Sequence, residues 1–231
     1  HVGAASAQRL VRLQDYRPGA GFLFRLIEER AHGAIKLGPG IDIASLPRAD
    51  DLELEFVSEH GRLVTALLWC GRLASAPRRA TLLPGGVTAS GDPVALPGWY
   101  GEIGRFLFEP DAALERAGLL GQIARGHALG ELHPGLGLLT GEADADTPWL
   151  RRFAVIDSLP CREDAVVDRL RAQDAGEVEV KTRGAAIDAM AVQRGLATSG
   201  LRGSRRLVLF GLRLGKRRIA IIAERQVDQS G

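Results

Sequence analysis

The sequence predicts an α/β protein with more than one domain, and three observations carry this prediction. Residues 1–72 combine apolar runs of strand length with one amphipathic helix. Residues 149–231 repeat both periodicities in a compact β-α-β-α-β-β pattern, and the acidic, small-residue segment 141–148 has the composition of a linker. We therefore expect one domain at 1–72, a connecting α/β region with its linker at 73–148, and a second domain at 149–231.

The first part carries strand, helix and hairpin signals in that order. The expected elements are a strand at 9–13, a helix from about 21 to 31, a strand at 34–37, and a hairpin of 52–58 with 63–70. Phe22, Leu23 and Leu26 give the helix one apolar face. These elements predict the back half of an α/β sheet that ends in an antiparallel hairpin.

The middle region is richer in Gly and Pro and contains fewer signals. The expected elements are a strand at 80–83, a helix at 112–126 and a strand at 135–140. Pro110 and Asp111 suit the start of that helix, because proline is tolerated there and an aspartate accepts hydrogen bonds from free helix amides.

The pattern of residues 149–231 predicts a small α/β domain. The expected elements are strands at 152–159 and 177–181, helices at 162–172 and 187–195, and a hairpin of 205–214 with 217–223. Val166, Val167 and Leu170 place an apolar stripe on the first of these helices.

Charge is distributed unevenly along the chain. Residues 1–148 hold 14 Lys+Arg against 18 Asp+Glu, whereas residues 149–231 hold 16 against 10. Because phosphates release counterions when cations replace them, the basic part predicts a polyanion as partner. The candidate nucleic-acid-binding residues are Lys181, Arg183, Arg205, Arg206, Arg213, Lys216, Arg217 and Arg218. The alternative is that these cations keep the hairpin in solution and pair with Glu177, Glu179 and Glu224.

Several function classes receive no support from the sequence. No apolar run approaches the ~18 residues that a membrane helix needs. Cys70 and Cys161 are far apart and have no Cys or His at ligand spacing. His32, His60, His127 and His133 each stand singly, with no carboxylate or Cys at metal-ligand spacing. We expect a cytoplasmic protein with reduced thiols, no metal site and no membrane partner.

Three short motifs carry a resemblance to a known family. They are Ile35-Lys36-Leu37-Gly38-Pro39-Gly40-Ile41-Asp42, Gly104-Arg105-Phe106-Leu107-Phe108-Glu109-Pro110-Asp111 and Val178-Glu179-Val180-Lys181-Thr182-Arg183-Gly184. Their order resembles that of bacterial class I S-adenosylmethionine-dependent methyltransferases with a C-terminal THUMP-like domain. The resemblance implies the C-terminal part of a Rossmann-like methyltransferase sheet, whose last strand doubles back antiparallel, followed by a small α+β THUMP-like domain. It also implies methyl transfer to RNA, with the THUMP-like part binding the substrate.

One expected feature of that family is missing from the sequence. No Asp/Glu-x-Gly-x-Gly sequence occurs, and both Gly19-Ala20-Gly21 and Gly38-Pro39-Gly40 are better explained as structural turns. The resemblance therefore implies that the cofactor-binding half precedes His1, where the catalytic residues would also lie. We expect S-adenosylmethionine in the full-length enzyme and no cofactor-binding residue in this chain.

Three residues near the first predicted sheet are candidates for the substrate side of the cleft. They are Tyr16, Lys36 and Asp42, which lie where ligands bind in open α/β sheets. Tyr16 could stack on a base, although a tyrosine that covers the end of the sheet is the better-favoured interpretation. The second functional hypothesis is a non-catalytic RNA-binding or scaffolding protein derived from such an enzyme.

Overall fold

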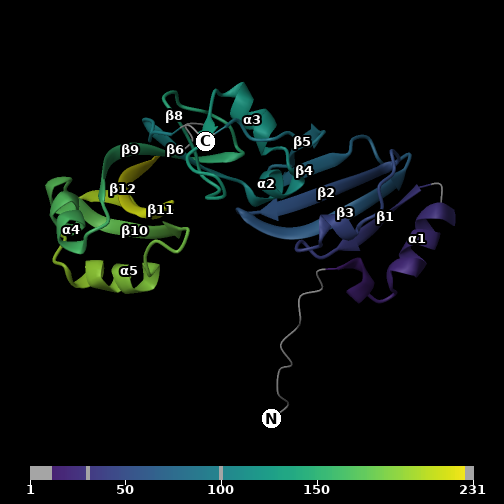
Figure 1. Ribbon diagram of the computed structural model, residues 1–231, viewed down its shortest axis with the longest axis horizontal. Coiled ribbons are helices and arrows are strands. Elements are labelled where there is room, and N and C mark those ends of the chain that lie inside the picture. Colours follow the sequence, from purple (N-terminus) through teal and green to yellow (C-terminus); the bar gives the residue numbers. More distant parts are fainter. Residues whose placement is uncertain (1–11, 30–31, 99–100, 227–231) are drawn as a thin grey trace, which may run out of the picture. The chain divides into compact units, whose positions relative to one another are not determined.

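A computed structural model describes residues 12–29, 32–98 and 101–226 (Figure 1). The chain divides into two compact units. The first consists of residues up to Ala95 together with Asp111–Ile123, and the second of Leu96–Pro110 together with the residues from Ala124 onward. Each unit is built around its own β-sheet.

The first unit contains a five-stranded sheet and short helices. Its elements are η1 Leu13–Asp15, α1 Ala20–Glu29, β1 His32–Leu37, η2 Ile43–Ser45, β2 Leu52–Glu59, β3 Arg62–Gly71, β4 Arg78–Leu83, β5 Val87–Gly91 and α2 Ala112–Ala117. The strand order is β1-β3-β2-β4-β5. β3 is antiparallel to both β1 and β2, so the last strand of the predicted hairpin doubles back between two strands of the opposite direction. This confirms the expected ending of the sheet, which β4 extends by pairing parallel to β2.

Alternation along β2 separates an apolar face from a polar one. Leu54 and Phe56 are buried on the first face, where the Arg116 guanidinium of α2 lies 5.5 Å from the centre of the Phe56 ring. The opposite face carries Glu53 and Glu55, which are also buried. Helix α2 is therefore fixed to the sheet by packing on one face only.

The structure breaks the helix expected at 112–126 into α2 and α3 Leu120–Gly126. Gly118 has a φ of +76°, in the left-handed region that ends helices at a glycine. Asp111 begins α2 as expected, because its carboxylate accepts a 2.8 Å hydrogen bond from the Ala113 N–H.

The second unit contains a seven-stranded sheet and two ten-residue helices. Its elements are β6 Phe106–Pro110, β7 Gly130–Glu131, β8 Leu139–Gly141, β9 Leu150–Pro160, α4 Glu163–Ala172, β10 Ala175–Arg183, α5 Ala189–Thr198, β11 Arg205–Leu214 and β12 Arg217–Gln226. The strand order is β10-β11-β12-β9-β6-β8-β7, with β10 parallel to β11 and the other pairs antiparallel.

The two faces of this sheet bury separate apolar clusters. Leu207 and Leu209 of β11 pack with residues of α4 and α5, whereas Val208, Phe210 and Leu212 pack on the other face with residues such as Phe153. The period-two alternation of strands places neighbouring side chains on opposite faces, which explains why β11 is almost wholly apolar in its middle.

Three expectations about organisation differ from the structure. The segment 141–148 is not a linker between the units, since it joins β8 and β9 of one sheet. The chain passes from one unit to the other after residues 95, 110 and 123, whereas the expected boundaries were at 72 and 148. The reason is that β6 and β8 of the middle region pair into the C-terminal sheet. Of the expected strand at 9–13, residues 9–11 lie outside the described residues and Leu13 begins η1.

Candidate nucleic-acid interface

The turn between β11 and β12 gathers four exposed cations. Gly215 takes a φ of +61°, which lets the chain reverse within two residues. The cations, called the hairpin tip below, are Arg213, Lys216, Arg217 and Arg218. The fold thus brings half of the eight predicted nucleic-acid-binding residues to one end of the sheet.

Neutral carbonyl groups position two of these cations. Arg213 donates to the backbone oxygens of Gly184 and Ala185 at 3.0 and 3.2 Å, and Arg218 donates to that of Ala186 at 3.5 Å. Within the described part of the chain, no hairpin-tip cation forms an ion pair with a carboxylate. Their positive charge therefore remains available to an external anion.

Arg205 and Arg206 lie at the opposite end of β11 and are paired with acids. Arg205 bonds the Glu224 carboxylate at 3.1 Å, and Arg206 bonds that of Glu177 at 2.9 Å. Arg213 lies eight positions after Arg205 along β11, a distance of about 26 Å at the usual rise per residue. These two arginines do not converge with the hairpin tip on one short phosphate track.

A buried carboxylate forms ion pairs with both Lys181 and Arg183. Glu109 of β6, whose side chain is 7% exposed, accepts hydrogen bonds from Lys181 Nζ at 2.7 Å and from Arg183 Nη2 at 2.8 Å. Lys181 is itself only 13% exposed and lies 5.6 Å from the centre of the Phe153 ring. Two of the three sequence motifs thus meet in space through this ion cluster.

Tyr16, Lys36 and Asp42 lie around the carboxyl end of β1 in the first unit. The Tyr16 hydroxyl accepts a 2.7 Å hydrogen bond from the Gly38 N–H, and Asp42 accepts one from the Ala44 N–H at 3.0 Å. Both side chains therefore stabilise the turn that follows β1. Lys36 is exposed and has no hydrogen-bond or ion-pair partner among the residues that the structure describes.

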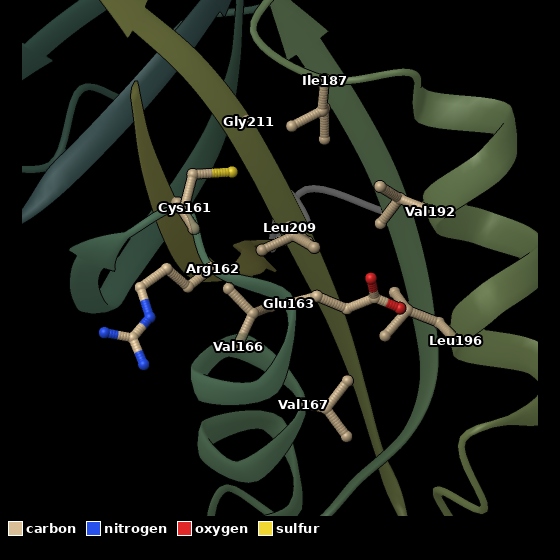
Figure 2. Close-up of a pocket in the computed structure, with 11 residues that line it drawn as sticks. Cys161, Arg162, Glu163, Val166, Val167, Ile187, Val192, Leu196, Leu209 and Gly211 are labelled. Atoms are coloured by element: carbon tan, nitrogen blue, oxygen red, sulfur yellow. The ribbon is translucent and has the colours of Figure 1, made fainter. Parts of the chain in front are cut away.

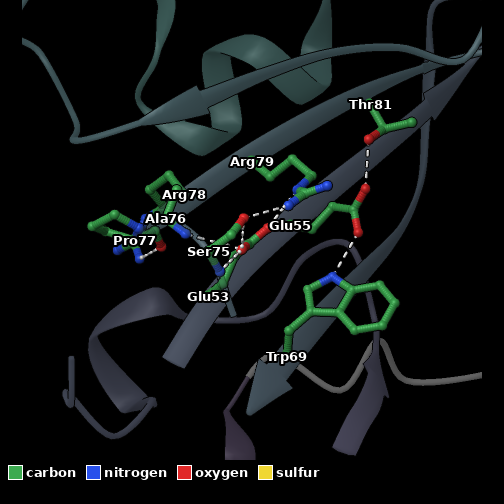
Figure 3. A network of polar contacts seen from close by, with 9 residues as sticks. All are labelled: Glu53, Glu55, Trp69, Ser75, Ala76, Pro77, Arg78, Arg79 and Thr81. Carbon is green, nitrogen blue, oxygen red and sulfur yellow. Dashed lines mark hydrogen bonds and ion pairs between the residues drawn. The ribbon is translucent and has the colours of Figure 1, made fainter. Parts of the chain in front are cut away.

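The polar face of the first sheet holds a carboxylate network that the sequence did not single out (Figure 3). Glu53 is fully buried and accepts hydrogen bonds from the Ser75 and Ala76 N–H groups at 2.6 and 3.1 Å and from the Arg79 guanidinium. Glu55 accepts a 2.7 Å hydrogen bond from the Trp69 indole N–H. Two glutamates at alternate positions of an otherwise apolar strand were the signal that could have identified it.

Burial alone would raise the pKa of the Glu53 carboxyl. The hydrogen bonds from Arg79 and from the two backbone N–H groups outweigh this effect, and together they hold the pKa below its ordinary value. The carboxylate therefore fixes the segment between β3 and β4 as a charged group.

An apolar groove lies between α4 and α5 on the sheet of the second unit. Its volume is about 180 Å³, with Val166 and Val167 on one side and Val192 and Leu196 on the other (Figure 2). Burial raises the pKa of the Cys161 thiol at one end of the groove, an effect that the charge of Arg218 partly offsets. This thiol is therefore protonated at neutral pH and poorly suited to act as a nucleophile.

Metal and membrane features are not found in the described residues. Residues 12–29, 32–98 and 101–226 contain no group of three or more His, Cys, Asp and Glu side chains that could hold a metal ion. No helix within the same residues is long and apolar enough to cross a membrane.

The fold and the basic surface define an α/β protein with a methyltransferase-like sheet ending and a small cationic α+β unit. Residues 150–225 match the family described as THUMP domain-like. Over 190 residues the chain is 35% identical to two proteins of Mycobacterium tuberculosis, from strains CDC 1551 and H37Rv, each named as an uncharacterized S-adenosylmethionine-dependent methyltransferase. The match covers 80% of this chain and 51% of each relative.

The fold also matches a solved structure. A crystal structure of a proposed methyltransferase from Porphyromonas gingivalis W83 superposes with a TM-score of 0.72 at 20% identity, covering 96% of this chain and 58% of that one. These matches confirm the resemblance: the chain is related to S-adenosylmethionine-dependent methyltransferases and carries a THUMP-like domain at its C-terminal end. It spans about half the length of the curated relatives it matches.

Proposed function

We propose that the THUMP-like domain binds RNA through the hairpin tip, as the substrate-binding part of an S-adenosylmethionine-dependent methyltransferase whose C-terminal portion is this chain. The observation that carries the proposal is the group of four exposed cations without a carboxylate partner in the described chain. Phosphates are the natural partners of such cations, because arginine bonds them in a planar, bidentate geometry. Contacts of this kind favour RNA affinity with little sequence preference.

The proposal restricts the predicted interface to one end of the domain. Lys181 and Arg183 are engaged by Glu109, and Arg205 and Arg206 by other glutamates. We therefore assign these four cations a smaller share of binding than the hairpin tip.

In this proposal, S-adenosylmethionine binds to the other half of the enzyme, which corresponds to the part of the relatives that this chain does not match. The turn Gly38-Pro39-Gly40 supports this assignment, since it leads into the three-residue helix η2 instead of an α-helix. Of the candidate substrate residues, Lys36 retains a side chain with no partner in the described chain, which favours it over Tyr16 and Asp42 for contact with substrate.

Two matched triple variants test the assignment of the interface. K216S/R217S/R218S removes three cations from the hairpin tip. R202S/R205S/R206S removes Arg205 and Arg206 at the opposite end of β11 and the exposed Arg202 shortly before this strand. Fluorescence anisotropy with a labelled structured RNA should show about a tenfold or larger loss of affinity for the first variant. The second should lose clearly less, and equal losses would contradict the proposed site. Urea unfolding of both variants checks that the domain remains folded.

A further inference from the structure

A cavity of about 570 Å³ lies in the first unit, beside the amino ends of β2 and β4. Its sheet side includes Leu54 and Leu68, which are paired in register on neighbouring strands. On the other side of β2, Leu54 is in register with Arg78 of β4, so that Leu68, Leu54 and Arg78 form one row across three strands. A cation thus stands on a sheet face where its neighbours are buried leucines.

A second arginine lines the same cavity. Arg48 comes from the segment that joins β1 to β2, and it forms no ion pair or hydrogen bond with any residue that the structure describes. The Arg78 guanidinium donates a 3.0 Å hydrogen bond to a neutral acceptor, the Pro77 carbonyl oxygen. Asp50 also lines the cavity but is not within ion-pair distance of either guanidinium.

The two guanidiniums act on one another as like charges. Burial lowers the pKa of Arg78, and the positive charge of Arg48 lowers it further. Arg78 nevertheless stays protonated in the physiological range, because the ordinary arginine pKa is far above it. A bound anion would relieve this repulsion and supply the partner that the described chain lacks.

We propose that this cavity binds an organic phosphate monoester of about nucleotide size, with its phosphate between Arg48 and Arg78 and its apolar or planar part against Leu52, Leu54 and Leu68. Guanidinium groups suit phosphate oxygens, and the volume falls within the usual range of small-molecule sites. The ligand could be a free nucleotide or the 5′-phosphorylated end of an RNA. The site is in the first unit and does not rest on the role proposed for the hairpin tip.

Calorimetric titration of the 231-residue chain with adenosine 5′-monophosphate, adenosine and inorganic phosphate tests the site. The monophosphate should bind at least about tenfold more tightly than either part alone, since only the whole ligand uses both halves of the cavity. R48S/R78S should weaken its binding about tenfold or more. R62S/R72S is the matched control, because it removes two exposed arginines of the same unit and should leave binding unchanged.

The variant R78L separates binding from folding. Leucine in the row of Leu54 and Leu68 should preserve or raise the unfolding temperature, since it removes a half-buried cation, while binding of adenosine 5′-monophosphate is lost. Adenosine that binds as tightly as its monophosphate, or binding that R48S/R78S leaves unchanged, would overturn the proposal.

Short RNA oligomers with and without a 5′-phosphate distinguish the two sources of the ligand. An advantage for the phosphorylated oligomer that disappears in R48S/R78S supports an RNA end. Binding of the mononucleotide alone, with the same dependence on the two arginines, supports a free nucleotide.

Discussion

The Glu109 carboxylate holds two cations that the charge pattern alone assigns to the surface. Lys181 and Glu109 are 72 positions apart in the sequence, so neither composition nor periodicity could have predicted their contact. A count of basic residues identifies a surface of positive charge, but it cannot say which charges are already neutralised. The structure supplies this information for four of the eight predicted cations.

Glu109→Gln should destabilise the second unit strongly. The change removes the buried carboxylate and leaves Lys181 with the half-exposed Glu179, 3.3 Å away, as its charged partner. Loss of one member of a buried pair costs roughly 3 kcal/mol. Glu177→Gln is the matched control, because the Arg206–Glu177 pair is 86% and 72% exposed and should contribute less than about 1 kcal/mol. Urea unfolding measures both changes, and equal effects would contradict the structural role of Glu109.

Glu53 makes the first unit sensitive to acid. Because its pKa is lowered in the folded state, the stabilisation is complete above the ordinary glutamate pKa of about 4.3 and is lost as the pH falls through the lower folded value. Unfolding free energies measured between about pH 5 and pH 3 should therefore fall more steeply for the natural chain than for Glu53→Gln. Glu59→Gln, at the exposed end of the same strand, should keep the natural slope.

Periodicity predicted most of the secondary elements well. The hairpins of β2 with β3 and of β11 with β12, together with α4, lie within a few residues of their expected positions. Strands and helices of this length can be predicted from the local periodicity of their apolar residues. The break at Gly118 and the pairing of β6 with β9 depended on backbone conformation and on long-range contacts, which local patterns do not contain.

The acidic segment 141–148 resembled a linker because its composition is polar and small. In the structure Ala145 is fully buried, while Asp144 and Asp146 lie 3.0 and 3.5 Å from a guanidinium nitrogen of the buried Arg152. The segment is therefore tied to β9 by its own charges.

D144N/D146N should make this segment easier to cleave. Without the two carboxylates, Arg152 loses its ion-pair partners here and the segment should open more often, so a protease cuts it faster. Glu142→Gln is the control within the same segment, because Glu142 forms no ion pair in the described chain. Limited proteolysis followed by mass spectrometry gives the cleavage rate at 141–148, and equal rates in all three proteins would show that the ion pairs do not restrain it.

For the molecule as a whole, the order of motifs predicted the family, while the division into units required the sheet pairing. The chain alone should not bind S-adenosylmethionine with micromolar affinity, since it contains no glycine-rich loop that would let the backbone approach the cofactor. Calorimetric titration of the isolated chain checks this expectation, and a micromolar dissociation constant would show that the cofactor site lies within these residues.

The salt dependence of RNA binding tests the central proposal most directly. Each phosphate contact contributes about −0.7 to −0.9 to the slope of log affinity against log salt concentration. If the hairpin tip binds the backbone, the slope of K216S/R217S/R218S should be shallower than that of the natural chain by about 2, while R202S/R205S/R206S stays close to the natural value. A hairpin-tip variant with the natural affinity and the natural slope would contradict the assignment of RNA binding to this surface.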